Sequence, residues 1–493
     1  MTPRSCCPAR GEKNRWPRVL ACVFAAATLL PTGAFGSGLS PPWVGHAFSG
    51  PATADAAATF WNPAMLSAVR TYRIEGNLEL VAPYITYTRE RKGTYQREDG
   101  LKFALPLEAS DIDRSKTGRA SQSVSPENTL IPAGSMFAAL PIHERVTLGL
   151  GFFGLAGAVI KFPETGPARW QLQEASLLAL GIPVAIGVRV TDKLRLGVGM
   201  YYVSGQVGLR KVADLAATDL LGTALKNPPI NQPNDFGASA PTGVRELSVL
   251  SRPFTLKDAK AHTATFSFGA AYDFTKDLTV GLTYIHRVAL KLKGRFALDM
   301  NDDFFTQDLS SQGLRYPAIV EGDAYVEFPL PSTIKAGLAW QVTPKFRLQF
   351  MLEYFHYSDV ENFAITLQSP GLAQPSLKVS DVVKLNEPRR WKNTLGTLAT
   401  GIYQLTKNID LGMTVGYSSS ASPDETVDLA SPDGDKLIFM WGARLTAGRI
   451  DFTAALHWQH ILERHVTNSD FDRANGIYKI DFVLFTGSIG FNF

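Results

Sequence analysis

The sequence predicts an all-β fold: a 14-stranded antiparallel transmembrane β-barrel with an N-terminal plug, or hatch, in its lumen. Three observations predict it. A turn-and-strand phrase recurs six times, connections between the predicted strands are short on one side and long on the other, and a Gly-, Ala- and Pro-rich segment without strand alternation precedes the first strand. Alternating strands, short periplasmic turns and long outer loops are typical of outer-membrane barrels.

The repeated phrase is a short polar turn followed by a strand whose fourth, sixth and eighth residues are apolar. Its copies begin at His143, Thr191, Thr275, Thr343, Thr406 and Ala447. In the copy at Thr406, the apolar residues Ile409, Leu411 and Met413 alternate with polar residues or glycine. A period of two places the two sets on opposite faces of a strand. Because nothing else in the chain could cover so many apolar faces, we expect those faces to meet lipid.

The strand count follows from the turns. Each of the six turns joins a descending strand to an ascending one, which gives 12 strands; one more opens the barrel at Ile74–Arg89, and a last one runs over Tyr478–Phe493. The total of 14 is even and leaves both ends on the periplasmic side. Closure removes strand edges, which lipid cannot hydrogen-bond.

The longer connections are expected outside the membrane, at residues 92–130, 211–262, 297–323 and 368–387. Within the longest of them, Leu220 and Leu221 belong to an approximate helical stripe. Two interpretations stay open for this stripe. It forms a short surface helix packed on the rim, or it offers an apolar landing site for a hydrophobic ligand.

The first 36 residues are expected to be a signal peptide. Five basic residues precede an apolar run of 12 residues from Val19 to Leu30, which is too short to span a bilayer. The small residues Ala34 and Gly36 both suit cleavage after them. All three cysteines lie in this leader, so the mature chain is expected to contain no disulfide.

Composition also narrows the function. After removal of the leader, 44 basic and 44 acidic residues remain, and a net charge near zero argues against a nucleic-acid partner. The sequence contains no Gly-x-Ser-x-Gly elbow and no phosphate-binding glycine loop, so we expect neither an enzyme nor a cofactor. Residues 37–72 are expected to form the hatch, because they are too few for an independent core, and residues 73–493 the barrel.

The segment from Gly45 to Leu66 closely resembles the N-terminal hatch of the FadL/TodX outer-membrane transporters of hydrophobic compounds. The matching residues are Gly45, Ala47, Gly50, Ala54, Asp55, Asn62, Pro63 and Ala64. Later stretches agree in order, so the resemblance extends over nearly the whole mature chain. It implies passive uptake of long-chain fatty acids or of aromatic or aliphatic hydrocarbons, with capture at the outer loops, an interior apolar pocket and release sideways through the barrel wall.

The lateral gap implied by the resemblance needs a bent or bulged strand, for which glycine is suited. Gly149, Gly151, Gly154 and Gly157 fall on the third strand, where the family has its kink. The alternative is that these glycines only make room for the hatch. The sequence departs from the family pattern here, with GLGFFGLAG, and again at Tyr284–Arg287, which leaves the substrate open.

Strand phase suggests which polar residues enter the lumen. Arg287, Lys335 and His457 are expected to face inward and are candidates for ligand binding, although lumenal cations commonly pair with acidic residues such as Glu353 or Asp451. No metal site is expected at His457, His460 and His465, because His457 and His460 point to opposite faces of a strand. The acidic stretch from Asp424 to Asp435 is expected to be a solvated loop rather than a cation site.

Two functions follow as alternatives: a transporter for hydrophobic compounds, which is favoured, and a general aqueous porin for polar solutes. The expected partners are the ligand, outer-membrane lipid and lipopolysaccharide, and the barrel-assembly machinery. The last of these would recognise the alternating final strand that ends at Phe493. We expect a monomer in the outer membrane of a Gram-negative cell.

Overall fold

The computed structural model describes residues 43–90, 94–96, 102–104, 123–127, 130–214, 251–307, 309–310, 313–377, 379–469 and 474–493. The predicted leader at residues 1–36 and the stripe at Leu220 and Leu221 therefore lie outside the described residues. No helix among the described residues is long and apolar enough to cross a membrane.

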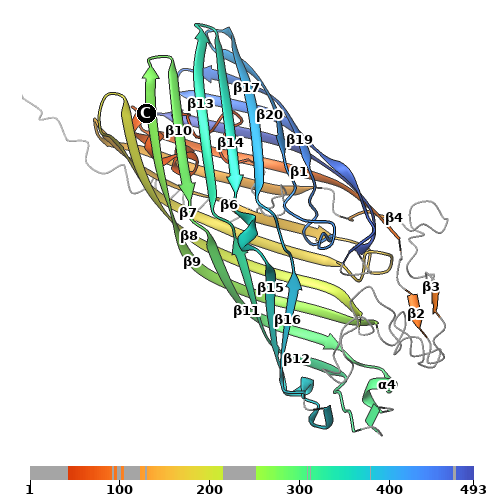
Figure 1. The fold of residues 1–493 in the computed structure, drawn as a ribbon. Helices are drawn as coiled ribbons and strands as arrows, with labels where there is room; N and C mark the ends of the chain where they lie inside the picture. Colours follow the sequence, from red (N-terminus) through yellow and green to blue (C-terminus); the bar gives the residue numbers. More distant parts are fainter. Residues whose placement is uncertain are drawn as a thin grey trace, which may run out of the picture. The chain divides into compact units, whose positions relative to one another are not determined.

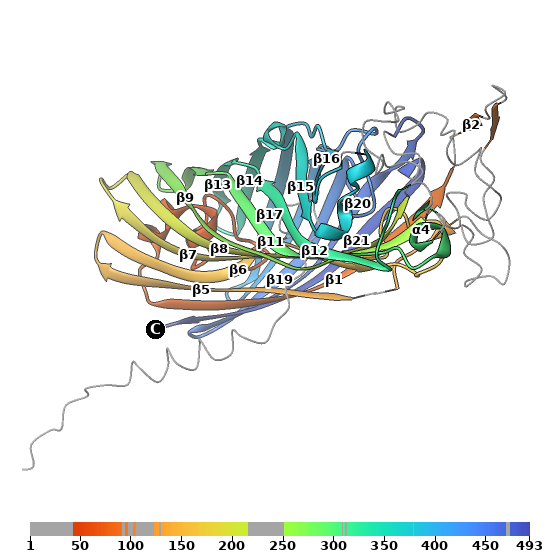
Figure 2. The same cartoon turned by 90° about the horizontal axis from the view of Figure 1, so that it is seen from below.

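The described strands form one closed antiparallel barrel of 14 spans, which confirms the predicted fold class (Figure 1 and Figure 2). The barrel closes where the first strand pairs with the last, from Arg73 opposite Asn492 to Arg89 opposite Gly476. Ten spans are single strands: β1 (Arg73–Arg89), β5 (Ile131–His143), β6 (Val146–Lys161), β7 (Glu174–Arg189), β8 (Leu194–Asp214), β9 (Ser251–Thr275), β18 (Ile409–Ser418), β19 (Lys436–Ala447), β20 (Ile450–Val466) and β21 (Gly476–Asn492).

The other four spans each consist of two segments: β10 (Leu278–Ile285) with β11 (Val288–Asp299), β12 (Ile319–Leu330) with β13 (Thr333–Thr343), β14 (Phe346–Phe355) with β15 (Asn362–Gln368), and β16 (Val382–Pro388) with β17 (Thr394–Thr406). These spans are neighbours, and their breaks lie side by side in the ladder. Figure 1 shows β10, β13, β14 and β17 in the upper half and the other four segments below them. The sequence phrase did not predict these breaks.

Two expected loop boundaries were wrong. Strand β9 begins at Ser251, well before the expected end of a loop at residue 262, and β16 lies within the expected loop 368–387. The early part of β9 pairs with β8 although it contains Pro253 and several charged residues. Strands that extend beyond the lipid need no apolar face, so the alternation that marks a membrane strand is absent there.

Small elements lie outside the ladder. The hatch contains α2 (Ala58–Trp61) and η1 (Pro63–Ala68); the outer connections contain β2 (Thr94–Gln96), β3 (Lys102–Ala104), α4 (Asp303–Thr306), η6 (Tyr357–Asp359), η7 (Pro370–Leu372) and η8 (Pro375–Leu377). The two-residue β4 (Ser123–Val124) pairs with the outer end of β1.

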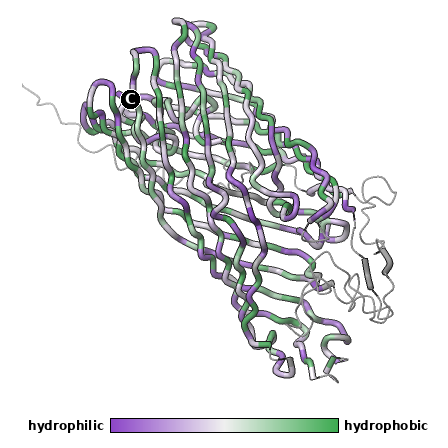
Figure 3. Tube along the Cα trace, in the orientation of Figure 1, coloured by the Kyte–Doolittle hydropathy of each residue, from purple (hydrophilic) through white to green (hydrophobic). Residues whose placement is uncertain are grey.

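The alternation in each phrase separates the two faces of the wall (Figure 3). On β8, Leu196, Val198 and Met200 are 45%, 51% and 61% exposed, whereas Arg195, directly before them, is buried and pairs with Asp273 of β9. The wall thus presents apolar side chains to lipid and keeps polar ones inside, as outer-membrane barrels require.

The polar turns of the phrase have a local cause. In the copy at Thr191, the threonine Oγ1 accepts hydrogen bonds from the backbone N–H groups of Lys193 at 3.2 Å and Leu194 at 2.9 Å. The copies at Thr343 and Thr406 use the same pair of bonds. A side-chain oxygen that binds the backbone two and three residues ahead stabilises a tight turn, which explains why threonine recurs at this position.

Candidate functional site

The hatch, here residues 43–69, lies within the ring of strands (red in Figure 1 and Figure 2) and nearly all of it is buried. Its last turn, η1, begins at Pro63. Proline suits the first position of a helix because its fixed φ is already helical and it has no N–H to satisfy. Asn62 precedes it as the N-cap, in an extended conformation, and its Oδ1 accepts the N–H of Ala64 at 3.1 Å. The Asn-Pro-Ala sequence therefore dictates the turn locally.

Asn62 also fixes the hatch to the wall. Its Nδ2 donates to the carbonyl oxygen of Pro51 within the hatch at 2.8 Å and to that of Ala270 on β9 at 3.1 Å. The side chain is fully buried. One amide thus satisfies three buried backbone groups, one of which belongs to the barrel.

A set of lumen-facing glycines lets the wall approach the hatch closely. A Cβ at Gly149 would lie 2.6 Å from Leu66 Cδ1, one at Gly197 would lie 2.7 Å from Pro63 Cβ, and one at Gly337 would lie 2.9 Å from Pro51 Cβ. We call the whole set the glycine seat: Gly149, Gly187, Gly197, Gly269, Gly281, Gly337, Gly412 and Gly442.

Sequence reasoning offered this role only for the glycines of the third strand, as an alternative that includes Gly149, and missed the other members of the glycine seat, although a signal for them was present. The seventh residue of the repeated phrase is glycine in four of the six copies, at Gly149, Gly197, Gly281 and Gly412. By phase, this residue faces the lumen one step above the periplasmic turn. A recurrent glycine at a lumenal position indicates that another part of the chain packs directly on the strand.

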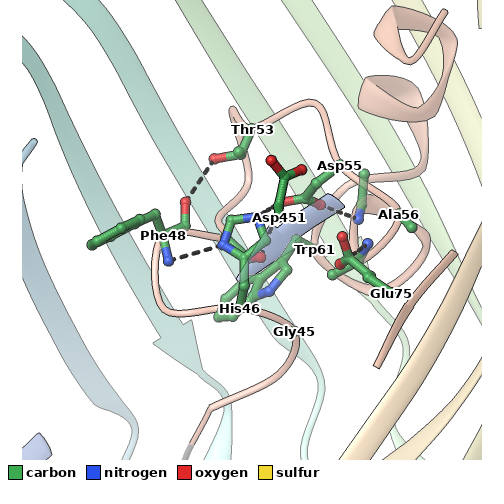
Figure 4. A network of polar contacts seen from close by, with 12 residues as sticks. Gly45, His46, Phe48, Thr53, Asp55, Ala56, Trp61, Glu75 and Asp451 are labelled. Carbon is green, nitrogen blue, oxygen red and sulfur yellow. Dashed lines mark hydrogen bonds and ion pairs between the residues drawn. The ribbon is translucent and has the colours of Figure 1, made fainter. Parts of the chain in front are cut away.

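A polar network anchors the other end of the hatch (Figure 4). Asp55 lies 3.1 Å from Nε2 of His46 and accepts hydrogen bonds from Ser49 Oγ and the N–H of Ala58, both at 2.9 Å. Burial alone raises the pKa of Asp55, but its hydrogen bonds with His46 and Ser49 and the nearby Arg73 outweigh it and hold that pKa below its usual value. Arg444 of β19 donates to the His46 ring at 3.1 Å, which joins this network to the wall.

The first strand supplies a second anchor. Glu75 of β1 accepts the N–H of Ala57 at 2.9 Å, and Arg73 pairs with Glu75 at 3.0 Å and with Asp451 of β20 at 2.7 Å. All of these side chains are buried or nearly so. Because a buried charge without a partner is costly, the ion pairs favour one position of the hatch against the wall.

An apolar cavity of about 60 Å³ lies between the hatch, the strands β8 and β9, and three of the broken spans, β10–β11, β12–β13 and β14–β15. Its lining includes Phe60 of the hatch, Tyr201, Val203, Ile285, Val288 and Phe355. Lys335 is the one lysine or arginine among the lining residues. Its Nζ lies 3.1 Å from Glu353 Oε1 and 4.3 Å and 4.1 Å from the ring centroids of Phe60 and Trp61. The cavity can therefore hold an apolar group and present one cation to a polar end.

The remaining hatch residues of the family pattern are structural. Gly45 has φ +83° and a Cβ there would lie 2.9 Å from Ser49 Oγ, so a side chain is excluded on both grounds. Its N–H donates to Ser135 of β5 at 3.2 Å. Ala47 and Gly50 are buried in the same segment.

The glycines of β6 separate into two groups. Gly149 contacts the hatch as part of the glycine seat, and a Cβ at Gly151 would lie 2.8 Å from the carbonyl oxygen of Met136 on β5. Gly154 directly precedes a register shift against β7, and the pairing of β6 with β5 ends at Phe153 opposite Ser135. Gly157 lies beyond that point, where β6 pairs only with β7.

The other two predicted ligand-binding candidates, Arg287 and His457, do not line the cavity as Lys335 does. Arg287 was expected to face inward, which was wrong: its side chain is 61% exposed, does not line the cavity and pairs with Asp359 at 3.7 Å. The reason is that the alternation changes phase at the break between β10 and β11. His457 is buried beside Trp43 of the hatch, with a ring-centroid distance of 5.6 Å, and does not line the cavity.

The other histidines and the acidic stretch bind protein groups. His460 pairs with Asp481 at 2.8 Å, and His465 with Glu90 at 2.7 Å. Within the described part of the chain, no cluster of three or more His, Cys, Asp or Glu could hold a metal. The stretch from Asp424 to Asp435 is not the solvated loop that was expected. Protein donors meet each of its carboxylates: Arg464 at Asp424, Asn468 at Glu425, Arg389 at Asp428, backbone N–H groups at Asp433, and Tyr417 at Asp435.

Comparisons with known proteins agree with this geometry. Residues 24–472 match the sequence profile of a family described as "Outer membrane protein transport protein (OMPP1/FadL/TodX)". Outer membrane protein P1 of Haemophilus influenzae is 20% identical over 438 residues, which are 85% of this chain and 85% of that protein. Among solved structures, a Pseudomonas aeruginosa FadL homologue superposes with a TM-score of 0.70 at 18% identity, covering 94% of this chain and 99% of that one. The P. putida toluene transporter TodX gives a TM-score of 0.62 at 14% identity, with coverages of 94% and 99%.

Proposed function

The chain belongs to the outer membrane protein transport family OMPP1/FadL/TodX, and on that premise we propose that it takes up hydrophobic small molecules passively through the cavity between its hatch and its wall. As a member, it is an outer-membrane β-barrel protein of a family that transports hydrophobic compounds. The observation that carries the proposal is the apolar cavity at Lys335, which Phe60 of the hatch closes from one side.

The cavity suits a hydrophobic ligand for a simple physical reason. Each CH₂ group removed from water contributes about 0.8 kcal/mol, so an apolar tail gains free energy on leaving the aqueous outer surface. A polar end gains a charge-assisted hydrogen bond at Lys335 if it is a carboxylate. The candidates are long-chain fatty acids and aromatic or aliphatic hydrocarbons.

We place release in the wall beside β6. Above Phe153 this strand is no longer paired with β5, and its register shifts at Gly154. Lateral release would pass the ligand to the membrane without exposing its whole apolar surface to water. Capture would occur at the outer loops. The protein would act as a monomer and without enzymatic chemistry.

A substitution at Lys335 can distinguish a carboxylate ligand from a hydrocarbon ligand. We expect the double variant Lys335→Met with Glu353→Gln, which leaves no unpaired buried charge, to bind oleate about 10- to 150-fold more weakly, because a hydrogen bond to a charged group contributes about 1.5–3 kcal/mol. Methyl oleate should bind as before. The measurement is fluorescence or calorimetric titration of the detergent-solubilised protein with each ligand.

The control is Lys291→Met, which changes an exposed lysine outside the cavity. Equal loss for oleate and its methyl ester would indicate damage to the cavity rather than loss of a carboxylate contact. If the wild-type protein bound neither ligand nor toluene and showed stable ion conductance in planar bilayers, the aqueous porin would be the better description.

A further inference from the structure

We propose that the barrel has a second lateral opening, between β9 and the β10–β11 span, through which the apolar cavity communicates with membrane lipid. We call it the β9 window and define its edges as Thr263–Thr265 and Arg287–Ala289. It lies apart from the unpaired stretch of β6. The passage of a hydrophobic ligand through the window rests on the proposed function. The contact of the window with lipid can be tested without that function.

The hydrogen-bond ladder defines the window. Strand β10 pairs with β9 as far as Ile285 opposite Ser267, and β11 pairs with β9 again only from Lys293 opposite Lys260. On its other side, β9 pairs with β8 continuously through this stretch. The N–H of His286 adds one more backbone hydrogen bond, to the carbonyl oxygen of Phe266 at 3.0 Å. The five residues of β9 that remain between the two bonded regions span about 17 Å at about 3.4 Å per residue.

Near Ile285, where the pairing of β9 with β10 ends, the side chain of Thr265 makes hydrogen bonds in place of the missing backbone pairs. Its Oγ1 donates to the carbonyl oxygen of His286 at 2.9 Å and lies 3.4 Å from that of Arg287. Backbone groups without a partner are costly in lipid, and open strand edges are tolerated only where they line a cavity. The threonine therefore satisfies carbonyl groups at the break that a continuous ladder would otherwise bind.

At the break between β10 and β11, the buried face of the strand changes from odd-numbered to even-numbered residues. Residues 281, 283 and 285 are buried in β10, whereas 288, 290 and 292 are buried in β11. An extra residue in the sequence of alternation bends a strand and changes its direction, as a β-bulge does. The three spans that follow β10–β11 around the barrel are broken at the same place, so neighbouring strands share the bend, and β11 meets β9 again only from Lys293.

The cavity reaches this opening. Thr265, Ile285, His286 and Val288 all line it. His286 also stacks on Phe266, with ring centroids 4.6 Å apart and an interplanar angle of 6°, and Phe266 is an exposed residue of the lipid face. One half-buried side chain thus contacts both the interior cavity and the outer surface. Tyr284 Oη, 2.8 Å from His286 Nδ1, holds its ring in that place.

The upper part of the slot is covered from inside. Leu290 is fully buried, and its Cδ1 lies 2.9 Å from the position of a Cβ at Gly205 of β8. Since Gly205 pairs with Ala261, Leu290 passes over β9 and covers the slot at that height. The lower part, at Thr265, His286 and Val288, is therefore where the window would open to lipid; Thr265 and Val288 are each 5% exposed in this structure.

The outer rim suits apolar molecules. Exposed aromatic side chains surround it on β8 and β9, namely Tyr202, Phe266 and Phe268. The second rim histidine, His262, stacks on Tyr202 and shares a 2.8 Å hydrogen bond with it. A flat apolar molecule or an acyl chain can contact these rings, whereas a hydrated ion would lose its water there without compensation.

Lipid accessibility tests the window without any transported ligand. The three cysteines lie at positions 6, 7 and 22, within the predicted leader, so a single new cysteine can be labelled. We expect bimane on Val288→Cys, in proteoliposomes with brominated acyl chains, to be quenched nearly as strongly as on the lipid-facing Leu282→Cys. Quenching as weak as on the lumenal Ala455→Cys would overturn the proposal.

A blocking variant tests passage. Ala264 is an exposed residue at the rim, and Ala454 is an exposed residue of β20 that is paired with both neighbouring strands. We expect Ala264→Trp to abolish the quenching at position 288 and to lower cellular uptake of radiolabelled oleate or toluene to about half, as narrowing one of two gates would, while Ala454→Trp changes neither. Unchanged uptake despite a blocked window would refute passage there. If even the wild-type protein took up neither probe, the proposed function would fail, and the quenching result would still decide whether the window exists.

Discussion

Gly197→Leu is expected to displace the hatch and convert the protein into a leaky channel. A Cβ at this position would lie 2.7 Å from Pro63 Cβ and close to the backbone of the same turn, which has no flexible side chain to move aside. Overpacking of this kind costs about 1–3 kcal/mol or more, which corresponds to about 5- to 150-fold in the docking equilibrium. We expect stable ion conductance in planar bilayers and loss of selective uptake, with the heat-modifiable barrel still assembled.

Gly487→Leu is the matched control, because a Cβ there meets only Phe485 at 3.9 Å and the residue pairs with lipid-facing Leu78. It should leave both conductance and uptake unchanged. If Gly197→Leu showed no ion conductance and normal uptake, the hatch would accommodate the new side chain. The glycine seat would then have no role in holding the hatch.

Asn62→Ala combined with Pro63→Gly is expected to leave the barrel assembled but to reduce uptake. The change removes the hydrogen bond to Ala270 of β9 and the fixed backbone that presents it. A buried group left without its partner costs about 1–3 kcal/mol, so the hatch should no longer hold one position against the wall. Heat-modifiability and uptake are measured on the same preparation.

Thr53→Ala serves as its control, since Thr53 Oγ1 bonds only within the hatch, to the carbonyl oxygen of Phe48 at 3.5 Å. If the double variant failed to assemble, the turn would be a folding element rather than a coupling between hatch and wall. Normal assembly with normal uptake would contradict both roles and leave the hatch a passive filler.

Much of the barrel was predictable because membrane strands repeat a simple physical rule. Alternation with period two, a polar turn and an even strand count follow from the lipid on one side and the lumen on the other. The phrase at Thr406 therefore predicted both its turn and its lipid-facing residues. The same phase placed Lys335 and Glu353 in the lumen, and the structure shows that they pair with each other. The Asn62–Pro63 turn was predictable for a different reason, because a cap and a proline act on their nearest neighbours.

What the sequence by itself determined was thus local: the period of each strand, the chemistry of each turn and the conformation of the hatch's last residues. The tertiary structure decided where spans break side by side, that Arg287 turns outward, and that Phe60 of the hatch meets Lys335 at an apolar cavity. These features depend on neighbours brought together by closure of the barrel, often hundreds of residues apart. A strand's own alternation cannot report whether the next strand stays paired with it, since pairing is a property of two strands and period is a property of one.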